Sequence, residues 1–304
     1  MTAALAAVLR QTAQRLRQAG VEAPAHEARL LAGAVLDADV AGLLAHPDRI
    51  LGPDQLRRLD AATDRRAARE PLSHIFGHRE FWRLGFRVDA DVLDPRPDSE
   101  TLVEAGLAAL ADRRRPWRLL DLGTGSGCLL LALLSELPAA TGIGIDLSPA
   151  AVRLAAANAS RLGLAARAAF ACGDWGAGLA GGFDLILSNP PYIPSAAIAG
   201  LAPEVALHEP RLALDGGPDG LACYRRLAPQ LPRLMAAGGR ILLELGDGQA
   251  EAVAAIMAEG GLAAESLRPD LGGRPRCLVL RPAGPTGIGP VAAKKPFGNP
   301  AEPG

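Results

Sequence analysis

The first seventy residues have the hydrophobic spacing of helices. Apolar side chains recur there at steps of three and four, the interval that places residues on one face of an α-helix. They are Leu5, Val8, Leu9 and Leu16, followed by Leu30, Leu31, Val35 and Leu36. The pattern predicts amphipathic helices packed into a small N-terminal helical domain over residues 1–70.

From residue 117 onward the pattern changes to apolar, strand-like runs that alternate with helical stretches. The expected strands cover 118–122, 142–147, 166–171, 183–188 and 239–245. Alternation of this kind is typical of helices packed on a mostly parallel sheet. We therefore predict a doubly wound α/β domain over residues 101–281.

Two other segments differ from both domains. Residues 71–100 contain four of the nine Phe and Trp residues together with Gly77 and Gly85, which predicts a β-hairpin linker between the domains. Residues 282–304 are rich in Pro and Gly and offer little to bury, so we expect a disordered tail there.

Composition and charge narrow the possible functions. The chain has 304 residues and a formal net charge of −1, which argues against binding nucleic acid through bulk electrostatics. Its four cysteines form no Cys-x-x-Cys pair, so neither a zinc site nor a disulfide framework is expected. No apolar run reaches the roughly 18 residues of a membrane span, and the first residues lack the basic region of a secretory signal. We expect a cytoplasmic protein that does not enter the membrane.

A glycine-rich turn joins the first expected strand to a helical stretch. It contains Asp121, Gly123, Thr124, Gly125, Ser126 and Gly127. Glycines let the backbone approach a ligand, and a helix N-terminus offers free N–H groups. Asp146 stands nineteen residues after Gly127, at the end of the next strand, where a carboxylate can bind ribose hydroxyls. The features predict a nucleoside cofactor site, and the structural alternative is a glycine turn with a helix-capping Asp.

The glycine spacing and two further residues bear on which cofactor binds. Gly-x-Gly-x-Gly differs from the Gly-x-Gly-x-x-Gly of nicotinamide dinucleotide sites. Asp121 can accept a hydrogen bond from a charged amine, such as that of S-adenosylmethionine. At the third strand end, Asp174 can bind the adenine amine and Trp175 can cover a ring, although Trp175 equally suits the rim of the core. We predict S-adenosylmethionine as the cofactor.

The fourth expected strand ends in a motif suited to a planar NH2 group, namely Asn189, Pro190, Pro191 and Tyr192. The two prolines remove two backbone donors and hold φ at about −65°, which leaves the Pro190 carbonyl free to accept a hydrogen bond. The Asn189 side chain adds a second acceptor, and Tyr192 adds an aromatic face. We predict that these residues bind the acceptor, with Asn189 also beside the cofactor. A tight turn after a buried strand is the alternative.

Three further features have two interpretations each. His74 and His78 are four residues apart, but no third ligand is evident and no metal is expected. Arg96, between two prolines, either reaches the active site or forms a local ion pair with Glu100. Glu209 either orders a loop over the acceptor pocket or belongs to a surface turn.

Together the motifs resemble the class I S-adenosylmethionine-dependent methyltransferases, and within them the release-factor glutamine methyltransferases of the HemK/PrmC family. The closer resemblance, over about residues 5–281, rests on three segments and a glycine cluster. These are Pro-Leu-Ser-His-Ile-Phe-Gly at 71–77, Leu-Asp-Pro-Arg-Pro-Asp-Ser-Glu at 93–100, Glu-Pro-Arg-Leu-Ala-Leu at 209–214, and Gly216, Gly217 and Gly220. Ser99 and Ser126 stand where Thr is common, and both keep a hydroxyl.

The resemblance implies a seven-stranded Rossmann-like sheet and an N-terminal domain that recognises the substrate. It implies methyl transfer to the glutamine side-chain nitrogen in the Gly-Gly-Gln motif of class-1 peptide chain release factors, with Asn189, Pro190 and Tyr192 as the catalytic residues. We expect a monomer that requires no metal. Two alternatives stay open, a methyltransferase of exocyclic amino groups in nucleic acid and a docking module without turnover. The charge balance disfavours the first, and the intact motifs disfavour the second.

Overall fold

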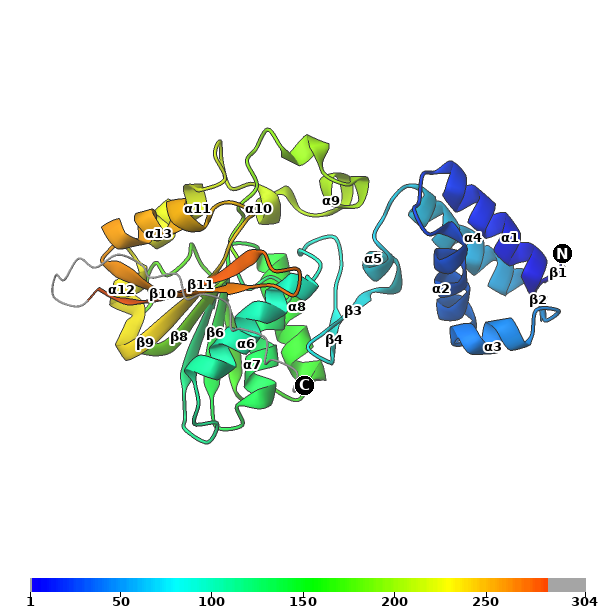
Figure 1. Ribbon diagram of the computed structural model, residues 1–304. Coiled ribbons are helices and arrows are strands. Elements are labelled where there is room, and N and C mark those ends of the chain that lie inside the picture. Colours follow the sequence, from blue (N-terminus) through cyan, green and yellow to red (C-terminus); the bar gives the residue numbers. More distant parts are fainter. Residues whose placement is uncertain (1, 284–304) are drawn as a thin grey trace, which may run out of the picture.

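The computed structural model describes residues 2–283. Figure 1 shows a group of N-terminal helices beside a larger unit in which helices cover a sheet, with a short helix and a hairpin between the two. Apart from its first two residues, the tail predicted over 282–304 lies outside the described residues.

The N-terminal unit is helical, as the hydrophobic spacing predicted. Its helices are α1 (Leu5–Gln18), α2 (Pro24–Leu36), α3 (Val40–Ala45) and α4 (Pro53–Ala67), and strands β1 (Ala3–Ala4) and β2 (Ile50–Leu51) pair beside them. Leu5, Leu16 and Leu31 are fully buried in the core that the helices share. Burying each leucine contributes roughly 1.5–3 kcal/mol, so this unit has a hydrophobic core of its own.

The connection to the larger unit contains the predicted hairpin. Strands β3 (His78–Phe81) and β4 (Leu84–Arg87) pair antiparallel. The side chains of Phe81 and Phe86 are buried in the core of the larger unit, which anchors the hairpin there. The preceding residues form a short helix, α5 (Leu72–Phe76), which the sequence pattern did not indicate.

The larger unit is built on one mixed sheet, which has seven strands within residues 2–283 in the spatial order β10, β11, β9, β8, β5, β6, β7. Their bounds are β5 (Arg118–Leu122), β6 (Thr141–Asp146), β7 (Ala168–Cys172), β8 (Phe183–Ser188), β9 (Met235–Glu244), β10 (Leu262–Pro269) and β11 (Pro275–Pro282). The five predicted strands are confirmed, with bounds that differ by a few residues. Strands β10 and β11 add an edge, in which β11 runs antiparallel to both of its neighbours.

Helices pack on both faces of the sheet, as Figure 1 shows, so the predicted doubly wound α/β fold is confirmed. One face carries α6 (Glu100–Ala109), α7 (Cys128–Glu136) and α8 (Pro149–Arg161), and the other carries α11 (Ala222–Leu227), α12 (Leu231–Leu234) and α13 (Ala250–Glu259). Shorter helices interrupt the loops, namely η1 (Pro97–Ser99), η2 (Ile198–Gly200), α9 (Pro203–His208) and α10 (Arg211–Leu214). Among the described residues, no helix has the length and apolarity to span a membrane.

Strand register brings the carboxyl ends of β5, β6 and β8 to the same edge of the sheet. Leu122, the last residue of β5, pairs with Ile145 in β6 and with Ser188 in β8. The glycine turn that follows Leu122 therefore lies beside Asp146, the last residue of β6, and Asn189, the first residue after β8. Open α/β sheets bind their ligands at this edge.

Candidate active site

A cavity of about 340 Å³ opens at the carboxyl edge of the sheet. Of the predicted site residues, its walls include Gly123, Thr124, Gly125, Ser126, Asp146, Asp174, Trp175, Asn189 and Pro191. Asp121, Gly127, Pro190 and Tyr192 are not part of the lining, which does contain Arg96, Ser99 and Arg226. The cavity is therefore lined by most of the predicted cofactor residues and, of the predicted acceptor residues, by Asn189 and Pro191.

The glycine turn takes a backbone conformation that other residues rarely adopt. Gly123, Gly125 and Gly127 have φ of +76°, +53° and +81°, values that favour a residue without a Cβ. The N–H of Gly123 donates to the carbonyl of Ile145 at 2.8 Å, which fixes the start of the turn against β6. A Cβ on Gly125 would meet no atom within 4 Å. The space above the middle of the turn is therefore open to a ligand.

Asp146 holds this turn while it keeps the capacity to bind more donors. Its Oδ2 accepts a hydrogen bond from the N–H of Gly125, and its Oδ1 accepts one from the N–H of Ser148, both at 2.9 Å. A carboxylate oxygen has two lone pairs, so each oxygen can accept one further hydrogen bond. Asp146 can therefore bind ribose hydroxyls without releasing the turn.

Asp121 is completely buried beneath the turn. The hydroxyl of Thr124 donates to Oδ2 at 2.7 Å, whereas Oδ1 has no hydrogen-bond partner within residues 2–283. Burial is the main cause that raises the pKa of Asp121 to about 7. An unpartnered buried acceptor destabilises a fold, and the charged amine of a bound cofactor is the kind of donor that would satisfy it. The unpartnered acceptor of Asp121 therefore fits a cofactor with an amino-acid tail.

Asp174 is paired with Arg226, a residue that the sequence did not single out. Nη2 of Arg226 donates to both carboxylate oxygens, at 2.6 and 2.5 Å, and about half of each side chain is exposed. Trp175, the next residue, has φ of +54°, which is uncommon for a bulky side chain. Its ring lies across Gly123, where a Cβ would be 3.5 Å away. Trp175 thus packs against the core and also forms a wall of the cavity.

Asn189 is held by one end of its side-chain amide. Its Nδ2 donates to the hydroxyl of Ser99 at 3.2 Å. No residue in the described part of the chain donates to Asn189 Oδ1 or to the carbonyl of Pro190. Two acceptors on consecutive residues therefore have no partner among the described residues, and their binding of an NH2 group stays a prediction.

Glu244 lies behind this motif, and the sequence analysis missed it. The hydroxyl of Ser99 donates to Oε2 at 2.5 Å, and the hydroxyl of Tyr192 donates to Oε1 at 3.3 Å. Burial is the main cause that raises the pKa of Glu244 to about 7. A single acidic residue in the apolar run at 241–245 was the available signal, because Glu is rarely buried without a specific reason. The role of Tyr192 as an aromatic face for the acceptor stays a prediction.

Arg96 forms its ion pair with Glu209 and not with Glu100. Nη2 of Arg96 lies 2.6 Å from Oε1 of Glu209, while Glu100 accepts a hydrogen bond from the N–H of Trp82. Only 1% of the Glu209 side chain is exposed, and burial is the main cause that raises its pKa to about 7. Of the two alternatives for each residue, the structure contradicts the local pair for Arg96 and the surface turn for Glu209, because the extended segment directs Arg96 toward the cavity and the later loop folds over it.

His74 and His78 differ sharply in their surroundings. His74 is buried, and burial is the main cause that lowers its pKa, while His78 is exposed. Neither belongs to a group of three possible metal ligands, and residues 2–283 contain no such group.

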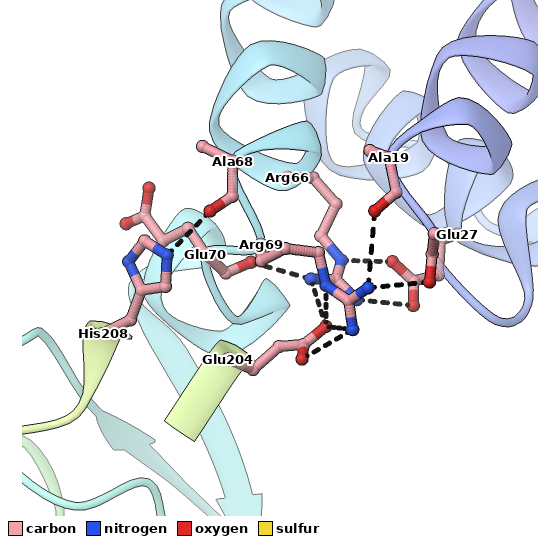
Figure 2. Close-up of polar contacts among 9 residues, drawn as sticks. Ala19, Glu27, Arg66, Ala68, Arg69, Glu70, Glu204 and His208 are labelled. Carbon is pink, nitrogen blue, oxygen red and sulfur yellow. Dashed lines mark hydrogen bonds and ion pairs between the residues drawn. The ribbon is translucent and has the colours of Figure 1, made fainter. Parts of the chain in front are cut away.

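The loop that follows Tyr192 contacts the N-terminal unit through α9. Glu204 accepts hydrogen bonds from Nε and Nη2 of Arg69, both at 2.8 Å, and lies 2.9 Å from Nη1 of Arg66. His208 Nε2 lies 2.8 Å from the carbonyl of Ala68. Figure 2 shows these side chains meeting between α4 and α9. Because Glu209 directly follows α9, this contact connects the N-terminal unit to the loop over the cavity.

We expect Glu204→Gln to lower the free energy of unfolding by about 1–3 kcal/mol, because Arg69 and the buried Arg66 lose a charged acceptor. Burial acts to raise the pKa of Glu204, but the hydrogen bonds from Arg69 and Arg66 outweigh it and lower the pKa from 4.5 to about 2. The stabilisation is therefore present above pH 4.5 and is lost as the pH falls toward 2. Urea denaturation at neutral pH measures the difference.

Asp60→Asn is the matched control for this prediction. Asp60 pairs with Arg15 inside the N-terminal unit, but 71% of its side chain is exposed. Exposed pairs contribute at most about 1 kcal/mol. A loss in Glu204→Gln that is no larger than the loss in Asp60→Asn would contradict a stabilising contact between α4 and α9.

Comparisons with known proteins identify the class. Residues 115–271 match a family described as a methyltransferase domain. A crystal structure of a methyltransferase from Pyrococcus furiosus superposes with a TM-score of 0.50, covering 72% of this chain and 98% of that chain at 16% identity, which bears on the fold alone. The protein therefore has the α/β Rossmann-like methyltransferase fold.

The N-terminal unit and two close relatives define the family further. Residues 7–77 match a family described as the PrmC N-terminal domain. The release factor glutamine methyltransferase of Rhodospirillum rubrum is 54% identical, over 91% of this chain and 85% of its own length. The protein of that name from Cereibacter sphaeroides is 47% identical, over 90% of this chain and 96% of its own length. The chain belongs to the release factor glutamine methyltransferase family.

Proposed function

We propose that this protein transfers a methyl group from S-adenosylmethionine to the side-chain amide nitrogen of the glutamine in the Gly-Gly-Gln motif of class-1 peptide chain release factors. The observation that carries the proposal is the 54% identity, over 91% of this chain, to a protein named for this substrate. The two free acceptors of Asn189 and Pro190 suit an amide as the methyl acceptor. Its place of action would be the cytoplasm.

The residues around the glycine turn would hold the cofactor. The open backbone of Gly125 would lie against it, on the turn that Gly123 and Gly127 shape, and Asp146 would bind its ribose hydroxyls. Asp121 would accept from its amine, directly or through a water molecule. Asp174 and Trp175 would contact the adenine. When bound, the cofactor supplies a methyl group that its sulfonium charge has already made electrophilic.

The chain's contribution to the chemistry would be orientation of the acceptor. An amide nitrogen is a poor nucleophile because its lone pair is delocalised into the carbonyl. Asn189 Oδ1 would accept one N–H of the glutamine, and the carbonyl of Pro190 would accept the other. Holding both hydrogens favours a pyramidal nitrogen and directs its lone pair at the methyl group. Positioning of reactants contributes up to roughly 7–11 kcal/mol in the best intramolecular cases.

The N-terminal unit would bind the release factor. Its contact with α9 gives it a physical connection to the loop over the cavity, through Glu204 on one side and Glu209 on the other. Docking on the N-terminal helices would thus place the Gly-Gly-Gln segment at the cavity mouth.

Transfer of labelled methyl from S-adenosylmethionine tests the proposal. The acceptors are a purified release factor, its variant with Gln replaced by Ala in Gly-Gly-Gln, bulk DNA and bulk RNA. We expect label on the parent factor alone. Label on nucleic acid alone would overturn the proposal in favour of a methyltransferase of base amino groups. Binding of cofactor and factor without any label would indicate a docking module.

A further inference from the structure

A chain of hydrogen bonds links Asn189 to two buried residues that come from distant parts of the sequence. Nδ2 of Asn189 donates to Oγ of Ser99 at 3.2 Å, and Oγ of Ser99 donates to Oε2 of Glu244 at 2.5 Å. Ser99 is 3% exposed and Glu244 is 1% exposed. Water therefore has little access to Ser99 or Glu244, and the packing of the fold keeps these hydrogen bonds in place.

Strand register explains why these residues meet. Strands β8 and β9 are parallel neighbours in which Ser188 pairs with Leu243. The residues that come next, Asn189 and Glu244, therefore lie side by side at the carboxyl edge of the sheet. Ser99, the last residue of η1, is placed between their side chains.

The single proton of the Ser99 hydroxyl sets the direction in which these hydrogen bonds are donated. An ionised carboxylate only accepts hydrogen bonds, so this proton must point at Glu244. The oxygen of Ser99 then presents lone pairs to Asn189, and these favour the NH2 end of the amide over the C=O end. If the Asn189 amide were flipped, its Oδ1 would face the lone pairs of the Ser99 oxygen. The Ser99 proton could turn toward Oδ1 only by leaving the buried carboxylate of Glu244, and either arrangement costs stability.

We propose that Ser99 and Glu244 are positioning residues that select the side-chain orientation of Asn189 in which Oδ1 is free to bind the substrate amide. This inference rests on the proposed function, in which Oδ1 accepts an N–H of the glutamine. Tyr192 supports the same arrangement, because its hydroxyl occupies the other carboxylate oxygen of Glu244 and limits rotation of that group.

Replacement of single atoms in the chain tests the proposal. Ser99→Ala removes the acceptor for Nδ2. Glu244→Gln adds an NH2 group that can donate to the Ser99 oxygen, so that the Ser99 proton no longer needs to point at residue 244. Each is expected to lower kcat about tenfold, the effect of one lost hydrogen bond, with KM for the release factor and Kd for S-adenosylmethionine within about threefold. Ser99→Thr keeps the hydroxyl and is expected to restore kcat to within about threefold of the parent. Assays at about pH 8.5 keep a group of pKa near 7 ionised.

The double variant separates positioning from general damage to the fold. If both residues act through one chain, Ser99→Ala with Glu244→Gln lowers kcat no further than either change alone. Independent structural defects would instead multiply. Ser135→Ala is the control, because its hydroxyl donates to the carbonyl of Ala132 within α7, away from the site. It is expected to leave kcat unchanged.

The orientation can also be observed without any acceptor. In NMR spectra of the free protein, the side-chain Nδ2–H resonances of Asn189, assigned by their absence in Asn189→Ala, are expected to shift in Ser99→Ala and to stay near their parent positions in Ser99→Thr. Unchanged resonances and unchanged kcat in Ser99→Ala, with the parent labelling the release factor, would overturn this inference alone. A parent that labels no release factor would overturn the proposed function, and the resonances would then decide the inference.

Discussion

Replacing Asn189 with alanine is expected to lower kcat for release factor methylation by about a hundredfold or more, the effect of removing a group that orients or stabilises the reacting atoms. The physical reason is the loss of Oδ1, one of two free acceptors that would hold the substrate NH2 group. Steady-state kinetics with release factor as the varied substrate measures the change.

Binding of the cofactor is expected to stay within about threefold of the parent in Asn189→Ala, because the glycine turn, Asp121 and Asp146 are untouched. Calorimetric titration with S-adenosylmethionine measures it. Asn189→Asp is the matched variant, since it keeps an acceptor at Oδ1 but replaces the Nδ2 donor to Ser99 with an oxygen. It is expected to be less active than the parent as well. Turnover of Asn189→Ala within a few-fold of the parent would show that orientation by this side chain is not the mechanism.

Replacing Asp146 with alanine is expected to raise the Kd for S-adenosylmethionine by about tenfold to a hundredfold, because hydrogen bonds to a charged group each contribute roughly 1.5–3 kcal/mol. Two effects combine in this change. The ribose hydroxyls would lose their acceptor, and the N–H of Gly125 would lose the oxygen that holds the turn, at 2.9 Å in the structure. Calorimetric titration of the variant measures the loss.

Asp184→Ala is the control for Asp146. Asp184 is also a carboxylate on a sheet strand that accepts from a backbone N–H, that of Arg118 at 2.9 Å. It stands near the start of β8, at the sheet edge opposite the cavity. Its replacement is expected to leave the Kd within about twofold of the parent while lowering stability. Equal losses of affinity in Asp146→Ala and Asp184→Ala would indicate general unfolding and would contradict a role for Asp146 in the site.

The elements that follow from local pattern were predicted well. Strands β5 and β8 are mostly apolar, each with one aspartate inside, and they are followed by turn residues; the structure gives them the predicted bounds. Strands β10 and β11 begin or end at prolines and carry charged residues such as Glu265 and Arg276. The local pattern of β10 is weak because it forms the edge of the sheet, whereas β11 lies between β10 and β9, and this pairing does not follow from the local pattern of either strand.

The contacts of the site also fall into those between residues close in sequence, which could be predicted, and those between distant residues, which could not. The contact between Thr124 and Asp121 spans three residues, and the role of the turn was readable from the sequence. The contact between Ser99 and Glu244 spans 145 residues, and that between Arg96 and Glu209 spans 113. Such pairs depend on which strand ends become neighbours in the folded sheet. Spacing along the chain does not encode that, so Glu244 was missed and the sequence could not decide between the two alternatives for Arg96.

Tandem mass spectrometry of a release factor incubated with this protein and S-adenosylmethionine is the most direct measurement. The proposed function predicts one added methyl group, located by fragment ions on the glutamine of Gly-Gly-Gln and absent when S-adenosylmethionine is omitted. A factor that stays unmodified, or that gains its methyl group at another residue, would contradict it.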